Sequence, residues 1–246
     1  MAWGSFGHIH LLSLLLAVLM IVGLYFVLKK RSQKVQVFVL GILSFSGFAA
    51  MIFNLVTWGS PLEYLPFHLC SLNAMVLPFA VFTRNKVLNN LLLFWALGAL
   101  FALVVNTAQA NFEIFSPTFA FYYFPHVLEL GIPILMFKLK LVKKELRCIL
   151  STVVITVLAY TAVHFINLGV NAYTVANNCL DYAGNVITVN YMYSLQPENP
   201  LLQVFYNILP FSYWYMFLAI PIVVVYLTLI YIKQWVAFFR QKRSAK

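Results

Sequence analysis

The apolar runs of this chain are long enough to cross a lipid bilayer, and they constrain its fold more than any other feature. Runs such as 11–28 and 87–105 approach the roughly 20 residues that a transmembrane helix needs. The chain is 63% hydrophobic and only 9% charged, whereas about a quarter of the residues in a soluble domain are charged. A transmembrane β-barrel would show short strands of alternating apolar and polar residues. We therefore predict an all-α membrane protein of one domain.

Apolar segments of spanning length occur seven times, and the third is shorter than the others. They lie at about 9–28, 35–57, 66–82, 87–105, 117–137, 148–169 and 212–232. The long connection 170–211 is rich in Asn and Tyr, and its part 200–209 has the pattern of a short amphipathic helix. Because a connection of this length in a compact protein is typical of a lid or binding element, or else is disordered, and this one is rich in aromatic residues and low in charge, we predict an ordered external loop that is a candidate lid.

The sixteen basic residues fall into four clusters, which follow the first, third, fifth and seventh apolar segments. The clusters are Lys29–Lys34, Arg84 with Lys86, Lys138–Arg147, and Lys233–Lys246. Because basic residues favour the cytoplasmic side, we predict a multi-pass protein of the cell membrane with its N-terminus outside and its C-terminus in the cytoplasm. The net charge of +10 is then explained by clusters beside anionic lipid, and no nucleic-acid binding is predicted.

A histidine and a carboxylate lie inside the fifth apolar segment, in the stretch YYFPHVLELGIP (122–133). His126 and Glu129 are three residues apart and therefore share a helix face, with Tyr122 one turn earlier. Titratable groups within a membrane are costly and mark functional sites. We predict that Glu129 orients or charges a catalytic histidine. The alternative is an internal hydrogen bond that joins two helices.

Two more histidines are expected at similar depth in the outer half of the membrane. His68 lies at the outer end of the third segment, and His164 lies about one turn below the outer end of the sixth. With the pair in the fifth segment they are the candidate catalytic residues. Three histidines and a carboxylate would also suit zinc, but there is no short-spaced ligand pair, so we predict no metal and no other cofactor. His8 and His10, beside the N-terminus, are predicted to be exposed.

Cys70 follows His68 by two positions in the stretch PFHLCSLN. In a regular helix these two side chains would point to opposite faces, and Cys70 has no basic neighbour in sequence to favour its thiolate. We therefore favour a buried structural thiol over a nucleophile. Cys148 is expected on the opposite side of the membrane from Cys70 and Cys179, so no disulfide framework is predicted, and a Cys70–Cys179 disulfide is a less favoured alternative.

Four stretches carry a resemblance to known proteins. They are LPFHLCSLN (65–73), YYFPHVLELGIPI (122–134), VHFINLGVNAYTVANN (163–178) and NYMYSLQPENP (190–200). With them, the chain resembles the bacterial YwaF family of integral membrane proteins from about residue 60 to the last span. It is also similar to distantly related eukaryotic transmembrane proteins that act as phospholipid acyltransferases, which move fatty acyl chains onto lysophospholipids.

The resemblance implies that His68, His126 and His164 match histidines of the family pattern. In the eukaryotic relatives, a proposed catalytic cysteine directly precedes the first histidine, where this chain has Phe67. Cys70 lies three residues later, so the resemblance does not carry a covalent acyl-cysteine intermediate over to this chain.

We predict a membrane acyltransferase that acts on lipid or lipid-linked substrates, such as glycerophospholipids or acylated lipoproteins, at the outer leaflet. His68 or His126 would act as general base on the acceptor hydroxyl or amine, and Glu129 would orient it. Substrate or oxyanion contacts are predicted for Asn73, Tyr122, Asn190 and Tyr191.

Two other functions fit the same sequence. A membrane transporter or substrate-binding subunit would use the polar site in the outer half of the bundle as a proton relay or ligand site. A scaffold would bind a protein partner through the external loop. The polar groups gather toward one side of the membrane, which favours a one-sided catalytic or binding site over a route through the protein.

Overall fold

The computed structural model describes residues 2–3, 6–57, 60–105 and 112–244. Two short strands, β1 (Ala2–Trp3) and β2 (Phe112–Glu113), pair in antiparallel fashion. The α-helices are α1 (His8–Leu28), α2 (Gln33–Ser44), α3 (Ser46–Thr57), α4 (Leu69–Thr83), α5 (Lys86–Val104), α6 (Pro117–Lys138), α7 (Arg147–Ala176), α8 (Pro200–Ile208), α9 (Ile220–Ile230) and α10 (Ile232–Ser244). Two 3₁₀ turns complete the described elements, η1 (Tyr191–Tyr193) and η2 (Trp214–Ala219).

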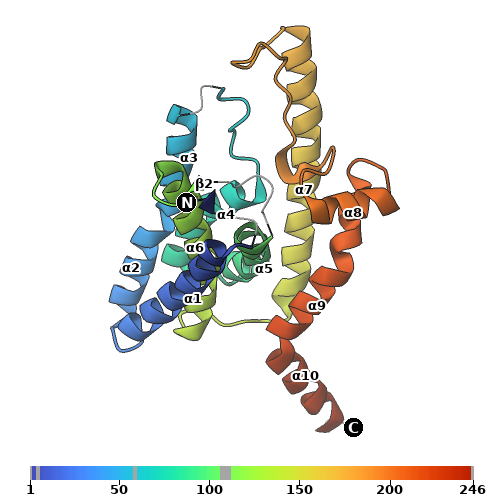
Figure 1. Ribbon diagram of the computed structural model, residues 1–246. Coiled ribbons are helices and arrows are strands. Elements are labelled where there is room, and N and C mark those ends of the chain that lie inside the picture. Colours follow the sequence, from blue (N-terminus) through green and yellow to red (C-terminus); the bar gives the residue numbers. More distant parts are fainter. Residues whose placement is uncertain (1, 4–5, 58–59, 106–111, 245–246) are drawn as a thin grey trace.

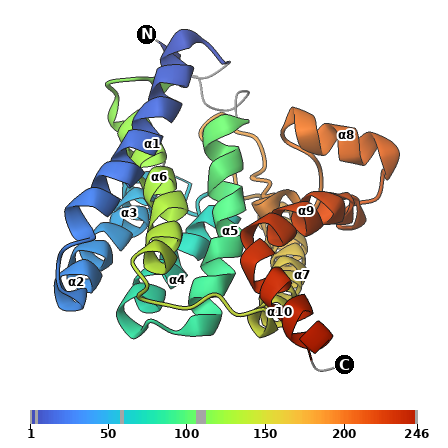
Figure 2. The ribbon, with the colours of Figure 1, turned by 90° about the horizontal axis from the view of Figure 1, so that it is seen from below.

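Helices α1 to α6 form one bundle, and α7 stands beside it with α8 and α9 along its other side, while α10 extends away past the lower end of α7 in Figure 1 (Figures 1 and 2). Helix α5 is central, because it packs against α4, α6 and α7. Helix α3 packs against both α4 and α6. The largest buried apolar cluster includes Leu77, Leu92 and Met136, which come from α4, α5 and α6. These contacts hold α4 and α6 in fixed register, and the candidate site lies on these two helices.

Five helical segments among the described residues are long and apolar enough to cross a membrane: α1, α2 with α3, α5, α6 and α7. The segment from η2 through α9 bends by 70° into α10 and makes a sixth if the bent pair is one span. Helix α4, with 15 residues, is shorter. The prediction of an all-helical membrane protein is confirmed, while the count of seven spans stays a prediction. Helix α7 continues to Ala176, past the predicted boundary at residue 169.

Capping side chains set where several helices begin. Ser116 accepts a hydrogen bond from the backbone N–H of Phe119 at 3.1 Å, and Pro117 occupies the first helical position of α6. Asn199 caps α8 in the same way, with Pro200 at its first position. Such caps satisfy an otherwise unpaired donor, and proline there removes another. Local sequence therefore fixes the start of α6, the helix that carries His126 and Glu129.

The four basic clusters gather at one end of the molecule. Three contacts join the segments that carry them: Arg84 Nη1 to Gln33 Oε1 at 3.3 Å, Lys86 Nζ to Glu145 Oε1 at 2.6 Å, and Lys144 Nζ to the carbonyl of Ile230 at 2.8 Å. Hydrogen bonds from Lys86 and Arg147 hold the pKa of the Glu145 carboxyl below its usual value. This arrangement is what a single membrane orientation requires, and the cytoplasmic position of this end stays a prediction.

The predicted external loop begins after α7 and runs back along that helix. Polar side chains at 167, 171 and 174 of α7 bond to the backbone of every second residue of the returning segment, at distances between 2.7 and 3.0 Å. The pairs are Thr174 with Ile187, Asn171 with Val189 and Asn167 with Tyr191. Because an extended chain turns alternate residues to one side, one polar face of α7 holds the segment in place.

Candidate functional site

Cys70, His126 and Glu129 come together between α4 and α6. The sulfur of Cys70, a ring nitrogen of His126 and a carboxylate oxygen of Glu129 all lie within 4.8 Å of one another. His126 and Glu129 occupy neighbouring turns of α6, and the first turn of α4 supplies Cys70. The side chain of Glu129 is only 3% exposed. We call these three residues the polar cluster. It contains the cysteine that sequence reasoning treated as a structural thiol.

A backbone contact fixes the tautomer of His126. Its Nδ1 lies 2.6 Å from the carbonyl oxygen of Tyr122. A carbonyl oxygen only accepts hydrogen bonds, so Nδ1 carries the proton and Nε2 keeps a lone pair. The Tyr122 ring lies 4.4 Å from the imidazole, and its hydroxyl donates to the carbonyl of Ala102 at 3.0 Å. Tyr122 therefore orients His126, and the Nε2 lone pair is the one available for a proton or a ligand.

Buried polar atoms beside the cluster lack hydrogen-bond partners. Asn73 stands one helical turn after Cys70 on α4 and is 1% exposed. Among the described residues, neither amide atom of Asn73 nor Oε2 of Glu129 has a partner. Buried polar groups are almost always satisfied, and leaving one unsatisfied costs about 1–3 kcal/mol. These atoms therefore indicate a place that is built for a polar ligand.

Helix α3 closes the cluster from a third side. A Cβ added to Gly47 would lie 2.3 Å from the Cβ of Ala74 and 3.2 Å from Oε1 of Glu129. Glycine is therefore needed where α3 crosses α4, because any side chain would collide with the neighbouring helix. Phe53 of α3 also stacks on Phe121 of α6 at 4.3 Å. The carboxyl of Glu129 is thus enclosed by three helices.

His68 lies at the start of α4 and not within it. Its backbone is extended, with φ −70° and ψ 153°, and the helix begins at Leu69. The argument that His68 and Cys70 point to opposite faces of a regular helix therefore does not apply, because α4 begins at the residue between them. The backbone N–H of Met192 donates to His68 Nδ1 at 3.4 Å. An amide N–H only donates, so Nε2 of His68 carries the proton.

The η1 turn brings Tyr193, which sequence reasoning missed, beside His68. Met192 and Tyr193 both have positive φ angles, 52° and 54°, which non-glycine residues adopt at an energetic cost. The Tyr193 ring lies 5.6 Å from that of His68. Burial first, and then the nearby Cys70 and Glu198, raise the pKa of the Tyr193 hydroxyl. The repeated Tyr in NYMY was the available signal, and the rings of both tyrosines lie near His68, at 5.5 Å for Tyr191 and 5.6 Å for Tyr193.

Asn190 and Tyr191 hold the external segment together. The Asn190 side chain donates to the carbonyl of Gln196 and to Glu198, and it accepts from the N–H of Leu195. The Tyr191 hydroxyl donates to the carbonyl of Leu62. Their side chains are therefore engaged within the protein, and the predicted oxyanion contacts find no support in this arrangement.

His164 pairs with a buried serine. Its Nδ1 lies 3.1 Å from Oγ of Ser194, which also accepts a hydrogen bond from Asn167 at 2.9 Å. The direction of the contact between His164 and Ser194 is set by the tautomer of the histidine. The three predicted histidines do not form one group: His126 belongs to the polar cluster, whereas His68 and His164 both contact the segment around η1.

His10 was predicted to be exposed, and that prediction is wrong. It is 1% exposed, its Nε2 lies 2.7 Å from the carbonyl of Leu103, and its ring packs on Trp3 at 4.9 Å. The pairing of β1 with β2 places Trp3 over the first turn of α1 and buries this histidine. His8 is exposed, as predicted.

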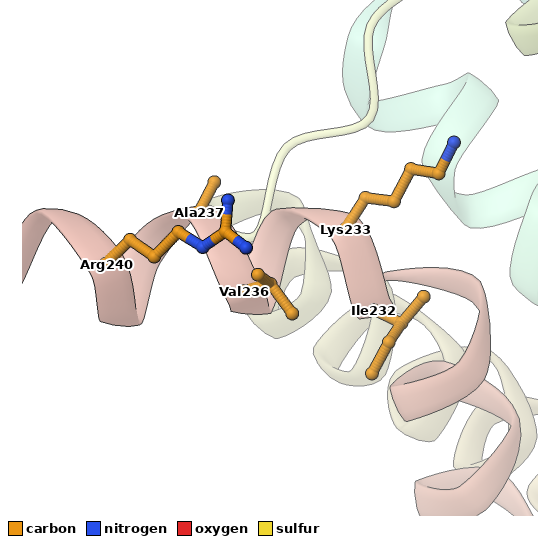
Figure 3. Close-up of a pocket in the computed structure, with 5 residues that line it drawn as sticks. All are labelled: Ile232, Lys233, Val236, Ala237 and Arg240. Atoms are coloured by element: carbon orange, nitrogen blue, oxygen red, sulfur yellow. The ribbon is translucent and has the colours of Figure 1, made fainter.

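A shallow depression lies on α10, at the end of the molecule that carries the basic clusters (Figure 3). Its lining residues all belong to that helix: Ile232, Lys233, Val236, Ala237 and Arg240. Their spacing places them along one helical face. The depression shares no residue with the polar cluster, so it is a surface feature of a basic helix and not part of the candidate site.

The fold and the cluster together define a polytopic helical membrane protein with titratable side chains enclosed in its bundle. The chain belongs to the TMEM164 family, whose family model matches residues 3–231. No curated protein and no solved structure matches the chain significantly. The expected membership in a family of transmembrane proteins is confirmed, and the YwaF assignment and bacterial source stay predictions.

Proposed function

We propose that the protein is a membrane acyltransferase that moves a fatty acyl chain between lipid or lipid-linked substrates at the outer leaflet of the cell membrane. The observation that carries the proposal is the convergence of Cys70, His126 and Glu129 within 4.8 Å. A thiol, an imidazole and a carboxylate within reach of one another are the groups that nucleophilic acyl transfer uses. The resemblance to transmembrane phospholipid acyltransferases supports acyl transfer as the reaction, while the covalent cysteine step rests on the cluster alone.

Each group of the cluster has a role that follows from its chemistry. His126 is the general base, because its Nε2 keeps a lone pair while Nδ1 bonds to Tyr122. Glu129 stabilises the imidazolium that forms when Nε2 takes a proton. His68, whose Nε2 carries a proton, is the donor on this side of the bundle that suits the developing oxyanion.

The proposed reaction has two steps that share one base. First, His126 takes the thiol proton of Cys70, and the sulfur attacks the ester carbonyl of the donor. A C–S bond forms, the ester C–O bond breaks, and the proton passes from His126 to the leaving alkoxide. Then His126 takes the proton of the acceptor hydroxyl or amine, which attacks the thioester. A C–O or C–N bond to the acceptor forms, the C–S bond breaks, and the proton passes from His126 to the sulfur.

Acyl transfer also requires that water be kept from the thioester. The segment that runs back along α7 serves this purpose in the proposal. It is held by the polar face of α7, and it places Tyr193 beside His68, two residues before Cys70. In this role the external loop acts as a fixed cover over the outer side of the cluster.

The test compares lipids and lipopeptides by mass spectrometry in cells with and without the protein. We expect a product that wild type restores and that His126→Gln lowers by about 10²-fold or more, as loss of a general base does. His8→Ala is the matched control, because His8 is exposed and far from the cluster in sequence. Full product formation by a His126→Gln protein present at wild-type level in the membrane would refute the proposal.

Cys70→Ala separates the covalent route from direct transfer. In the covalent route this variant makes no product, and wild type treated with acyl donor alone carries a hydroxylamine-sensitive acyl group. Cys148→Ala is the control, because that thiol is also unpaired but lies at the other end of the bundle. Activity retained by Cys70→Ala together with loss in His126→Gln would support direct attack by the acceptor.

A transporter or substrate-binding subunit is the second candidate. The unpaired atoms of Asn73 and Glu129 favour it, because they suit a polar ligand whether or not that ligand reacts. Proteoliposomes that contain the purified protein distinguish the two functions. Substrate counterflow without lipid modification would support transport, and acyl exchange between lipids in the same vesicles would support the enzyme.

A further inference from the structure

We propose that the polar cluster binds a zinc ion and that bound zinc blocks acyl transfer. Binding of the metal goes beyond the proposed function and does not depend on it, whereas the inhibition rests on it. The proposal stands on the positions of Cys70, His126 and Glu129 and on the unpaired atoms around them.

The three side chains offer the ligand types that zinc prefers. Zinc is bound by thiolate at about 2.3 Å, by imidazole at about 2.0–2.1 Å, and by carboxylate at about 2.0–2.2 Å. Tetrahedral bonds of these lengths place the ligand atoms roughly 3.3–3.7 Å apart. The three atoms already lie within 4.8 Å of one another. Closing the remaining distance requires only small side-chain rotations, because α4 and α6 are packed together and need not move.

The surroundings of the cluster match those of metal sites. A metal-bound histidine almost always donates its second ring N–H to a carbonyl or carboxylate, as His126 does to the carbonyl of Tyr122. Glu129 is buried, and its Oε2 has no hydrogen-bond partner in the part of the chain that the structure describes. A cation at this point would satisfy the carboxylate. Asn73, on the same side of α4 as Cys70, adds an amide oxygen that is also unpaired there.

The composition of the cluster selects among metal ions. Magnesium and calcium take six or more oxygen ligands, and this cluster provides one carboxylate. A thiolate combined with an imidazole favours zinc. Three protein ligands leave the fourth tetrahedral position to water or to the Asn73 amide oxygen. We therefore expect zinc to bind to a single site and to exchange with chelators.

Bound zinc removes both reactive groups of the proposed mechanism. The ion takes the Nε2 lone pair of His126, which then accepts no proton. It also displaces the thiol proton of Cys70, which is released to solvent, and it holds the sulfur as a ligand. Neither a free base nor a free nucleophile is left in the cluster, and acyl transfer stops.

The binding test uses the full chain in detergent, purified with a tag that contains no histidine. Cobalt(II) serves as the spectroscopic probe, because a thiolate ligand gives it an intense charge-transfer absorption in the near ultraviolet. We expect one cobalt per protein with this absorption, and its displacement by zinc. Cys70→Ser and His126→Gln should each lower zinc affinity on the order of 100-fold or more, since even outer-shell changes cost 10–100-fold.

The controls remove the other metal-binding groups of the chain. A Cys148→Ser/Cys179→Ser double variant and His8→Ala should keep both the charge-transfer absorption and the affinity. Absence of a thiolate band in wild type, or zinc affinity unchanged in both Cys70→Ser and His126→Gln, would overturn the proposal. Glu129→Gln gives a third check, because it keeps the side-chain volume and weakens only the carboxylate ligand.

The effect on activity is measured separately, by acyl transfer in vesicles with and without zinc. We expect zinc to inhibit wild type and a chelator to restore the activity. Activity that a chelator abolishes would show a required metal and would overturn the inhibitory role. Cys70-dependent zinc binding without any acyl transfer would refute the proposed function and leave the metal site standing. Acyl transfer without zinc binding would refute the metal site and leave the proposed function standing.

Discussion

In His126 and in His68, a single backbone group decides which ring nitrogen carries the proton, and the outcome is opposite in the two residues. The carbonyl of Tyr122 accepts a hydrogen bond from His126 Nδ1, which leaves Nε2 as an acceptor. The N–H of Met192 donates to His68 Nδ1, which leaves Nε2–H as a donor. An imidazole has one proton to place in its neutral form. The partner on one nitrogen therefore decides whether the other nitrogen acts as a base or as a hydrogen-bond donor.

Asn73 offers the sharpest test at a single residue. Its buried amide lacks partners within the described part of the chain, so it contributes a desolvation cost of about 1–3 kcal/mol without a compensating bond. We expect Asn73→Leu, which has nearly the same size, to raise the thermal unfolding temperature in detergent while it lowers acyl transfer. A variant that is both less stable and fully active would show that the amide is satisfied internally and has no role at the site.

At the scale of elements, the contact of α3 with α4 depends on Gly47, which has no side chain. A Cβ at Gly47 would overlap Ala74, and the neighbouring helix has no room to shift because it is packed on α5 and α6. We expect Gly47→Ala to destabilise the protein by about 1–3 kcal/mol, measured by thermal unfolding in detergent, and to lower activity by displacing Glu129.

The matched control for this crossing is Gly23→Ala in the middle of α1, where an added Cβ meets nothing within 4 Å. It should leave stability unchanged or raise it by about 0.4–1 kcal/mol, because alanine restricts the unfolded chain. Equal effects of the two substitutions would mean that helix propensity, and not the crossing of α3 with α4, sets the outcome.

The polar face of α7 controls a second element, the segment that carries η1. Asn167 exchanges two hydrogen bonds with the backbone of Tyr191 and donates a third to Ser194. We expect Asn167→Ala to speed hydrogen exchange of the Tyr191 amide by about tenfold, because that N–H loses its hydrogen bond to the Asn167 side chain. The variant should also lower acyl transfer. Asn177→Ala removes an exposed amide near the end of α7 and should change neither. Unchanged exchange in Asn167→Ala would mean that the segment holds its own shape.

At the scale of the whole molecule, the sequence predicted the features that depend on composition and on the spacing of apolar and polar residues. The apolar runs indicated the helices, and the pair His126 and Glu129 was predicted on one face because both lie on one helix. Cys70 was not expected there, because its approach to His126 depends on how α4 packs against α6. The polar face of α7 was visible as spacings of three and four residues from His164 to Thr174. The segment that bonds to this face could not be predicted, because an irregular backbone has no repeating sequence pattern.

Membrane orientation is the remaining property that belongs to the whole molecule. Contacts place all four basic clusters at one end of the bundle, so they must lie on the same side of the membrane. The positive-inside rule predicts that this side is cytoplasmic. In a chain without native cysteines, we expect Tyr182→Cys to react with a membrane-impermeant maleimide in intact cells. Lys34→Cys should react only after the cells are broken. Both positions are exposed, so accessibility within the protein does not limit either reaction. The reverse labelling would place the polar cluster in the inner half of the membrane and would move the proposed reaction to the cytoplasmic leaflet.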